Sequence, residues 1–149
     1  MLSLKNIGIE DVSINIYAKN WEDAIEKASK KMLDRGDITR EYVTSMINNV
    51  RKFGPYIVMT KNVALAHARP EDGAKVTSLH FSTLIPEIEF GSKENDPVKL
   101  LIVLSAKDTD SHIKLLAELS KILANSEVIK MLINTDSDET FVKIIKDYV

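Results

Sequence analysis

Two histidines of this chain come shortly after apolar runs that are typical of β-strands. His67 directly follows the small apolar residues Val63–Ala66. His112 comes a few polar residues after the longer run Leu100–Ala106. A neutral imidazole is a good nucleophile toward phosphorus near pH 7, because its unperturbed pKa of about 6.5 leaves one ring nitrogen unprotonated. The other nitrogen must donate its proton to a fixed acceptor, such as a backbone carbonyl. Two such histidines predict a phosphoryl-transfer site without metal or nucleotide.

Two arginines are candidates for stabilising the charge of a phosphoryl group. Arg69 lies two residues after His67, and Arg51 ends a predicted helix. A guanidinium matches phosphate oxygens with paired donors. The helix start that carries His112 adds a partial positive charge, which favours a bound phosphoryl dianion. Each residue also has an ordinary interpretation: a plain loop histidine, a solvated residue of a first helical turn, and solvated surface arginines.

Hydrophobic periodicity predicts the elements that position these residues. A strand is expected at 12–16, a helix between the cap Asn20 and Gly36, and a second helix between the cap Thr39 and Gly54. Further strands are expected at 56–59, 63–66, 75–84 (stopped by Pro86) and 98–106, and helices at 111–123 (capped by Asp110 or Ser111), 126–132 and 137–147. This order predicts one α/β domain over residues 1–149, a mixed sheet with helices packed on it. The very apolar run at 100–104 is expected to lie buried on both faces in mid-sheet, with His112 following at its carboxyl edge.

Composition excludes several classes of function. A chain of 149 residues with a formal net charge of −2 fits one domain without a general attraction to nucleic acid. It has no cysteine, no phosphate-binding glycine loop, and no short histidine spacing typical of a metal site, so we expect no cofactor and no metal. His80, on a predicted strand, is interpreted as structural or half-exposed. The N-terminus lacks a secretory signal and no apolar run could cross a bilayer, so we expect a cytoplasmic protein.

The loop motif carries a family resemblance. The segment Lys52–Val58, followed by Val63–Gly73 with its His-Ala-Arg-Pro-Glu-Asp-Gly run, resembles the enzyme IIA domain of the mannitol/fructose type in the bacterial phosphoenolpyruvate-dependent sugar phosphotransferase system. Within that family it looks most like the ascorbate branch and its galactitol-like or pentitol-like relatives. Further matches are Asn95–Leu100 and Ser111-His112. The resemblance covers nearly the whole chain.

The resemblance implies a role for each candidate. His67 would accept a phosphoryl group from the histidine-containing phosphocarrier protein HPr and pass it to an enzyme IIB component. His112 matches the second active-site histidine, and Arg51 falls near the family's active-site arginine. Arg69 and Ser111, beside the two histidines, would face the phosphoryl group or a partner protein. The family's fold is a mixed sheet with helices on both sides, and the carrier needs no cofactor.

One position departs from the family pattern. Ala66 stands where the residue before the active histidine is usually proline, and its loss is expected to relax the loop because proline fixes φ. The same residues would also suit a regulatory module whose histidine phosphorylation controls a transporter or a transcriptional regulator. A chain of this length with no appended DNA-binding segment favours the carrier. A metal-binding enzyme is a weaker alternative, and the exposed apolar residues leave room for a homodimer.

Overall fold

The computed structural model describes residues 3–149, so Met1 and Leu2 of the N-terminal stretch lie outside it. Its centre is a five-stranded sheet in the order β1-β4-β5-β3-β2. The pair β2 and β3 and the pair β4 and β5 are antiparallel, whereas β1 runs parallel to β4 and β3 parallel to β5. The predicted mixed sheet is therefore confirmed. The strands are β1 (Val12–Ile16), β2 (Val58–Thr60), β3 (Val63–Ala66), β4 (Ser78–Ile88) and β5 (Val98–Ser105).

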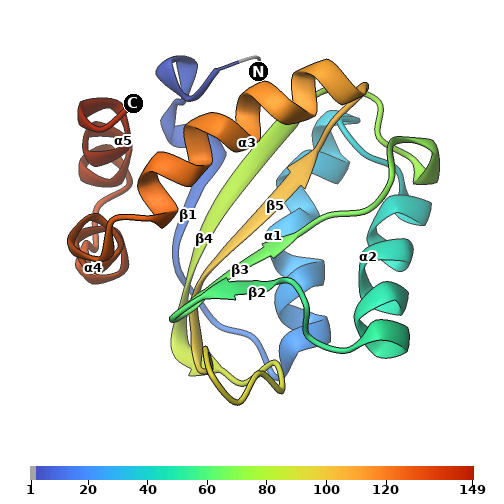
Figure 1. Ribbon diagram of the computed structural model, residues 1–149, viewed down its shortest axis with the longest axis horizontal. Helices are drawn as coiled ribbons and strands as arrows, with labels where there is room; N and C mark the ends of the chain where they lie inside the picture. The colour runs from blue at the N-terminus through green and yellow to red at the C-terminus, as the bar shows by residue number, and fades with distance from the viewer. Residues whose placement is uncertain (1–2) are drawn as a thin grey trace.

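Helices cover both faces of the sheet, as expected. The face carrying α1 (Trp21–Arg35) and α2 (Arg40–Phe53) is opposite the face carrying α3 (Thr109–Leu123), α4 (Ser126–Asn134) and α5 (Asp138–Asp147) (Figure 1). Short 3-10 helices lie at Leu4–Asn6, Ile9–Asp11 and Pro70–Asp72. The chain thus forms one three-layer α/β domain.

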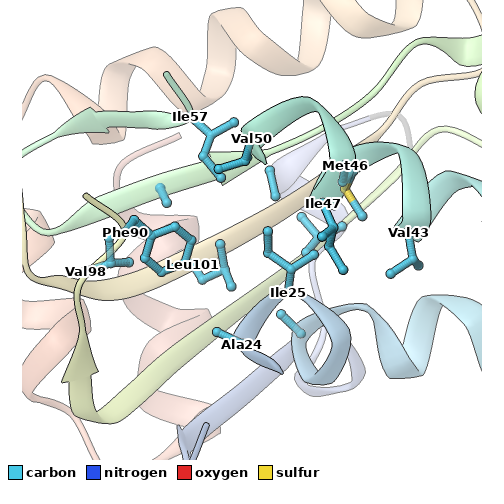
Figure 2. Packing of buried hydrophobic residues seen from close by; sticks show 14 of the residues in the cluster. Ala24, Ile25, Val43, Met46, Ile47, Val50, Ile57, Phe90, Val98 and Leu101 are labelled. Carbon is cyan, nitrogen blue, oxygen red and sulfur yellow. The ribbon is translucent and has the colours of Figure 1, made fainter. Parts of the chain in front are cut away.

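Side chains of the central strand alternate between two hydrophobic cores. In β5, Leu101 and Val103 face α1 and α2, whereas Ile102 and its neighbours two residues away face α3–α5. Every residue of β5 except Lys99 is buried, which confirms the prediction of a strand covered on both faces. Figure 2 shows Ile25 of α1 pointing toward α2, whose Ile47 belongs to the same core.

The long strand differs from its prediction at both ends. Residues 75–77 do not join the sheet, because the N–H groups of Lys75 and Val76 bond instead to the carbonyl of Asp37. The strand also continues past Pro86 to Ile88. Its pairing with β5 shifts between Thr83 and Ile88, so the proline lies in an irregular, exposed stretch. A proline is tolerated there since no ladder hydrogen bond is required of it.

The parallel pairing of β3 and β5 determines where the candidate site forms. Ala66 at the end of β3 pairs with Val103 near the end of β5. The chain therefore leaves both strands at the same edge of the sheet, through the loop that begins with His67 and through the turn into α3. The cap of α3 is Asp108 rather than the predicted Asp110 or Ser111, so the helix begins two residues earlier than expected.

Candidate functional site

A pocket of about 590 Å³ lies at this edge, and both His67 and His112 line it. Its walls come from the inner side of α2, from the loop that follows β3, and from the first turn of α3. The structure therefore brings together two histidines that are 45 positions apart in the sequence, as predicted from the two strand ends.

The ring of His67 is held in one orientation. Its Nδ1 lies 2.9 Å from the carbonyl oxygen of Leu65. A carbonyl only accepts, so Nδ1 carries the proton and Nε2 carries the free electron pair. Nε2 has no hydrogen-bond partner among residues 3–149. The ring of Tyr56 meets the imidazole edge-on, with centroids 6.0 Å apart and planes at 90°. The half-buried His67 thus presents the tautomer that a nucleophile at Nε2 needs.

His112 belongs to the first turns of α3 and is also half-buried. Partial burial and, secondly, the positive charge of a protonated His67 hold the pKa of His112 below the ordinary value for histidine. A neutral imidazole at this position can donate one hydrogen bond to a phosphoryl oxygen without first losing a proton. The electrostatic effect of one histidine on the other agrees with their place in one pocket.

The N-terminus of α3 contributes less positive charge than expected. Asp108 Oδ1 accepts the N–H of Ser111 at 2.8 Å, and this hydrogen bond holds the pKa of the Asp108 carboxyl below its usual range. The charged cap offsets part of the helix dipole. Ser111 therefore serves the cap through its backbone, and its side chain does not line the pocket.

Cationic side chains reach the pocket from two sides. Arg69 lines it from the loop and Lys52 from α2. The neighbouring Arg51 does not line it: its guanidinium lies 3.3 Å from the Glu22 carboxylate and 3.5 Å from the Asn48 side-chain oxygen. Successive helical residues point about 100° apart, so Arg51 and Lys52 face different surroundings. The active-site role of Arg51 stays a prediction.

Sequence reasoning missed several residues of the pocket. Ser45, Asn49 and Lys52 project from one side of α2, at the helical spacing of three to four residues. Tyr56 and the first helical residue of α3, Thr109, also line the pocket, as do the carboxyl-bearing residues Asp72 and Asp108. The spacing on α2 was readable, but this polar stripe borders the apolar face and resembles an ordinary solvated helix surface.

The third histidine lies elsewhere and is sealed in the interior. Only 1% of His80 is exposed, and its Nε2 shares a hydrogen bond of 2.8 Å with Ser13 Oγ. Burial, together with the positive charges of Lys31 and Arg35, lowers the pKa of His80 to about 4. The interpretation of His80 as structural is supported, but it is not half-exposed. Within residues 3–149, His, Asp and Glu side chains do not gather in threes around a potential metal position.

Comparison with known proteins decides the family. Residues 6–148 match the family model described as phosphoenolpyruvate-dependent sugar phosphotransferase system, EIIA 2. The chain belongs to this family. It is a phosphotransferase, an enzyme IIA component of the sugar phosphotransferase system that carries a phosphoryl group on histidine, as the resemblance in the sequence implied.

Individual relatives and a solved structure of this family are similar to the chain over most of its length. The mannitol-specific cryptic phosphotransferase enzyme IIA component of Escherichia coli K12 is 34% identical over 134 residues, 90% of either chain. The solution structure of the E. coli mannitol-specific cryptic enzyme IIA CmtB, also 34% identical, matches with a TM-score of 0.85 over 93% of both chains. The ascorbate-specific EIIA component of E. coli K12 is 31% identical over 113 residues, 74% of this chain and 73% of that one.

A more distant structure shows the same fold. It is the E. coli complex of enzyme IIA for mannitol with phosphorylated enzyme IIB, whose matching chain is 24% identical with a TM-score of 0.82, over 95% of this chain and 98% of that one. Among residues 3–149, no helix is both long and apolar enough to span a membrane.

Proposed function

We propose that His67 is the phosphoryl acceptor of this enzyme IIA component, receiving the group from HPr and passing it to an enzyme IIB component in the cytoplasm. The observation that carries the proposal is the hydrogen bond of 2.9 Å between His67 Nδ1 and the Leu65 carbonyl. It leaves Nε2 as the free nucleophilic nitrogen in a pocket shared with His112. The other two histidines have a lesser claim, since His80 is sealed and His112 lacks a comparable carbonyl partner in the described chain.

The transfer is a direct exchange between two imidazoles. The electron pair on His67 Nε2 attacks phosphorus, and the bond between phosphorus and the nitrogen of the donor's phosphohistidine breaks. The donor ring keeps the electron pair of the broken bond. The proton of His67 stays on Nδ1, hydrogen-bonded to the Leu65 carbonyl. Catalysis then rests on positioning and on electrostatic stabilisation of the phosphoryl oxygens. Lys52, Arg69 and His112 supply the donors and positive charge that line the pocket.

The rim of the pocket suits brief contact with two partners in turn. Phe53 and Tyr56, both exposed, line it, and the exposed Ile113 follows His112 on α3. Exposed apolar side chains around a polar centre are typical of docking surfaces. A carrier must release each partner quickly, so a small interface is expected. The relative whose structure contains phosphorylated enzyme IIB supports the choice of the second partner.

The test is phosphoryl transfer in a purified system. The protein is incubated with phosphoenolpyruvate, enzyme I and HPr, and its intact mass is followed. We expect one acid-labile phosphoryl group on the wild-type chain and none on His67→Gln. The matched control is His112→Gln, which changes the other pocket histidine and should still be labelled, only more slowly. Labelling of His67→Gln to the wild-type level would exclude His67 as acceptor.

A further inference from the structure

One buried hydroxyl connects the two chain segments that carry the histidines. Tyr42 lies in the first turn of α2, and its side chain is completely buried. The hydroxyl donates a hydrogen bond of 2.6 Å to the carbonyl of Leu104, at the end of β5 on the way to His112. It accepts a hydrogen bond of 3.0 Å from the N–H of Ala68, the residue that follows His67.

The Tyr42 hydroxyl stays protonated, and it is the hydrogen-bond partner of both the Leu104 carbonyl and the Ala68 N–H. Burial raises the pKa of Tyr42 to about 12, so the phenol keeps its proton at any physiological pH. Two carbonyl oxygens lie within reach of its single hydrogen, that of Leu104 at 2.6 Å and that of Ala68 at 3.3 Å. The hydrogen points to the nearer one, Leu104, and the hydroxyl lone pair receives the Ala68 N–H. A buried backbone group that loses its partner is costly. Without the hydroxyl, the segments around Ala68 and Leu104 must move or take in water.

The backbone of His67 is thereby fixed on both sides. Before it, Ala66 pairs with Val103 in the parallel ladder between β3 and β5. After it, Ala68 is tied to Tyr42. The imidazole in turn bonds to a carbonyl of the preceding strand. The direction of Nε2 therefore depends on two anchors, one in the sheet and one on α2.

The same turn of α2 also holds the far end of the loop. The Thr39 N–H donates a hydrogen bond of 3.0 Å to the carbonyl of Gly73. Gly73 has φ +128°, and a Cβ there would overlap the hydroxyl of Thr39. The start of α2 thus fastens the loop 68–73 near both of its ends.

We infer that Tyr42 is a positioning residue for phosphoryl transfer, whose hydroxyl sets the place of the His67 ring relative to His112. The inference deepens the proposed function, and its kinetic part rests on that proposal. The inference also bears on Ala66, which stands where the family usually has proline. Alanine does not fix φ as proline would, and the hydrogen bond from Tyr42 restrains the backbone two residues later, at Ala68.

The main test compares Tyr42→Phe with the wild type in two kinds of measurement. Nitrogen-15 NMR reads the tautomer of His67 and the titration of His112, which do not depend on any partner. Single-turnover transfer from phosphorylated HPr reads the chemical step. We expect the tautomeric preference of His67 to weaken and the titration midpoint of His112 to shift. We expect kcat to fall about tenfold with an unchanged KM for HPr, since a small misplacement of the reacting groups lowers the rate of the chemical step.

The matched control is Thr83→Val, another loss of one buried hydroxyl. Thr83 Oγ1 accepts the N–H of Asn15 at 2.7 Å and lies on β4, level with the start of β3 rather than with its end at His67. This variant should lose stability while both the His67 tautomer and kcat stay at wild-type values. If Tyr42→Phe does not fold, lactate in place of Ala68 removes the same hydrogen bond from the loop side. That ester variant should reproduce the predicted changes.

The outcomes separate the two proposals. Unchanged tautomer, titration and kcat in a folded Tyr42→Phe protein, or in the ester variant, would overturn the role of Tyr42 while leaving His67 as acceptor. Equal losses of kcat in Tyr42→Phe and Thr83→Val would overturn it too, because a general loss of stability would then suffice. A wild-type chain that takes up no phosphoryl group would refute the proposed function, and the NMR measurements would still decide whether Tyr42 positions His67.

Discussion

His67 and His80 carry the same side chain in opposite settings. His67 follows the end of β3, bonds to a carbonyl through Nδ1 and keeps Nε2 free in a pocket. His80 is the third residue of β4, inside the sheet; it bonds to Ser13 through Nε2 and has its Nδ1 buried without a partner. Both rings therefore have one nitrogen without a hydrogen-bond partner, but only that of His67 can be reached from outside the protein.

The contrast shows what turns an imidazole into a phosphoryl acceptor. Burial shields His80 from water, leaves its Nδ1 without a partner and keeps the ring neutral to low pH. At His67 the surrounding positive groups, Lys52 and Arg69, lie where incoming negative charge would be. Near His80 the positive groups, Lys31 and Arg35, only disfavour its protonation. The two histidines differ because His67 lies in the loop just after a strand, whereas His80 lies within a strand of the sheet.

The largest expected difference is in chemical reactivity. Diethyl pyrocarbonate acylates accessible neutral imidazoles, so the folded protein should react at His67 and should react at His80 more than about a hundredfold more slowly, since the latter must wait for local unfolding. Peptide mapping by mass spectrometry measures both rates. In denaturant all three histidines should react alike, which is the control. Equal rates in the folded protein would contradict the difference in access.

The next expected effect is on stability. The folded pKa of His80, about 4, lies below its unfolded value near 6.5. Below pH 6.5 the unfolded chain binds a proton that the folded chain does not, so stability falls as pH drops from 6.5 to 4 and is unaffected by His80 above that range. Between pH 6.5 and 5 the loss should be about 2 kcal/mol. Urea unfolding at several pH values measures it.

The variant His80→Gln provides the comparison for this slope. It keeps a polar group near Ser13 but does not titrate in this range, so its stability should be lower overall and should lack the His80 part of the pH dependence. His112, whose pKa is also lowered, contributes a smaller slope of the same sign in both proteins. An identical pH dependence of the two proteins would show that His80 is not the source.

The sequence was sufficient for the layout that separates these histidines. Two apolar runs, one of them buried on both faces, predicted strands whose ends deliver His67 and His112 to one edge. What it could not give is the direction of individual side chains. Arg51 and Lys52 are neighbours of similar charge, and only the packing of α2 against α1 decides that Lys52 reaches the pocket. The sequence around Tyr42 gives no sign of its role, because the partners of its hydroxyl come from segments distant along the chain.

The two cations at the end of α2 offer a direct test of that side-chain direction. Lys52→Gln removes a charge that lines the pocket, and a charged hydrogen-bond donor lost from a phosphoryl site should slow transfer from HPr about tenfold. Arg51→Gln, the matched change one residue earlier, removes an exposed ion pair with Glu22 and should slow transfer less than twofold. Single-turnover rates of the two variants measure the difference. The reverse order would restore Arg51 as the charge-stabilising residue and require it to leave Glu22 when a partner binds.

The smallest expected effect concerns the aromatic wall of His67. Tyr56 meets the imidazole edge-on, and its hydroxyl-bearing side chain lines the pocket together with Asn49. Tyr56→Leu removes the ring contact and should slow transfer about threefold, since aromatic pairs contribute roughly 0.5–1.5 kcal/mol. Tyr56→Phe keeps the ring and removes only the hydroxyl, so its rate should stay close to that of the wild type. If the phenylalanine variant were as slow as the leucine variant, the hydroxyl rather than the ring would be the important group, and the imidazole of His67 would owe its orientation to Leu65 and the loop alone.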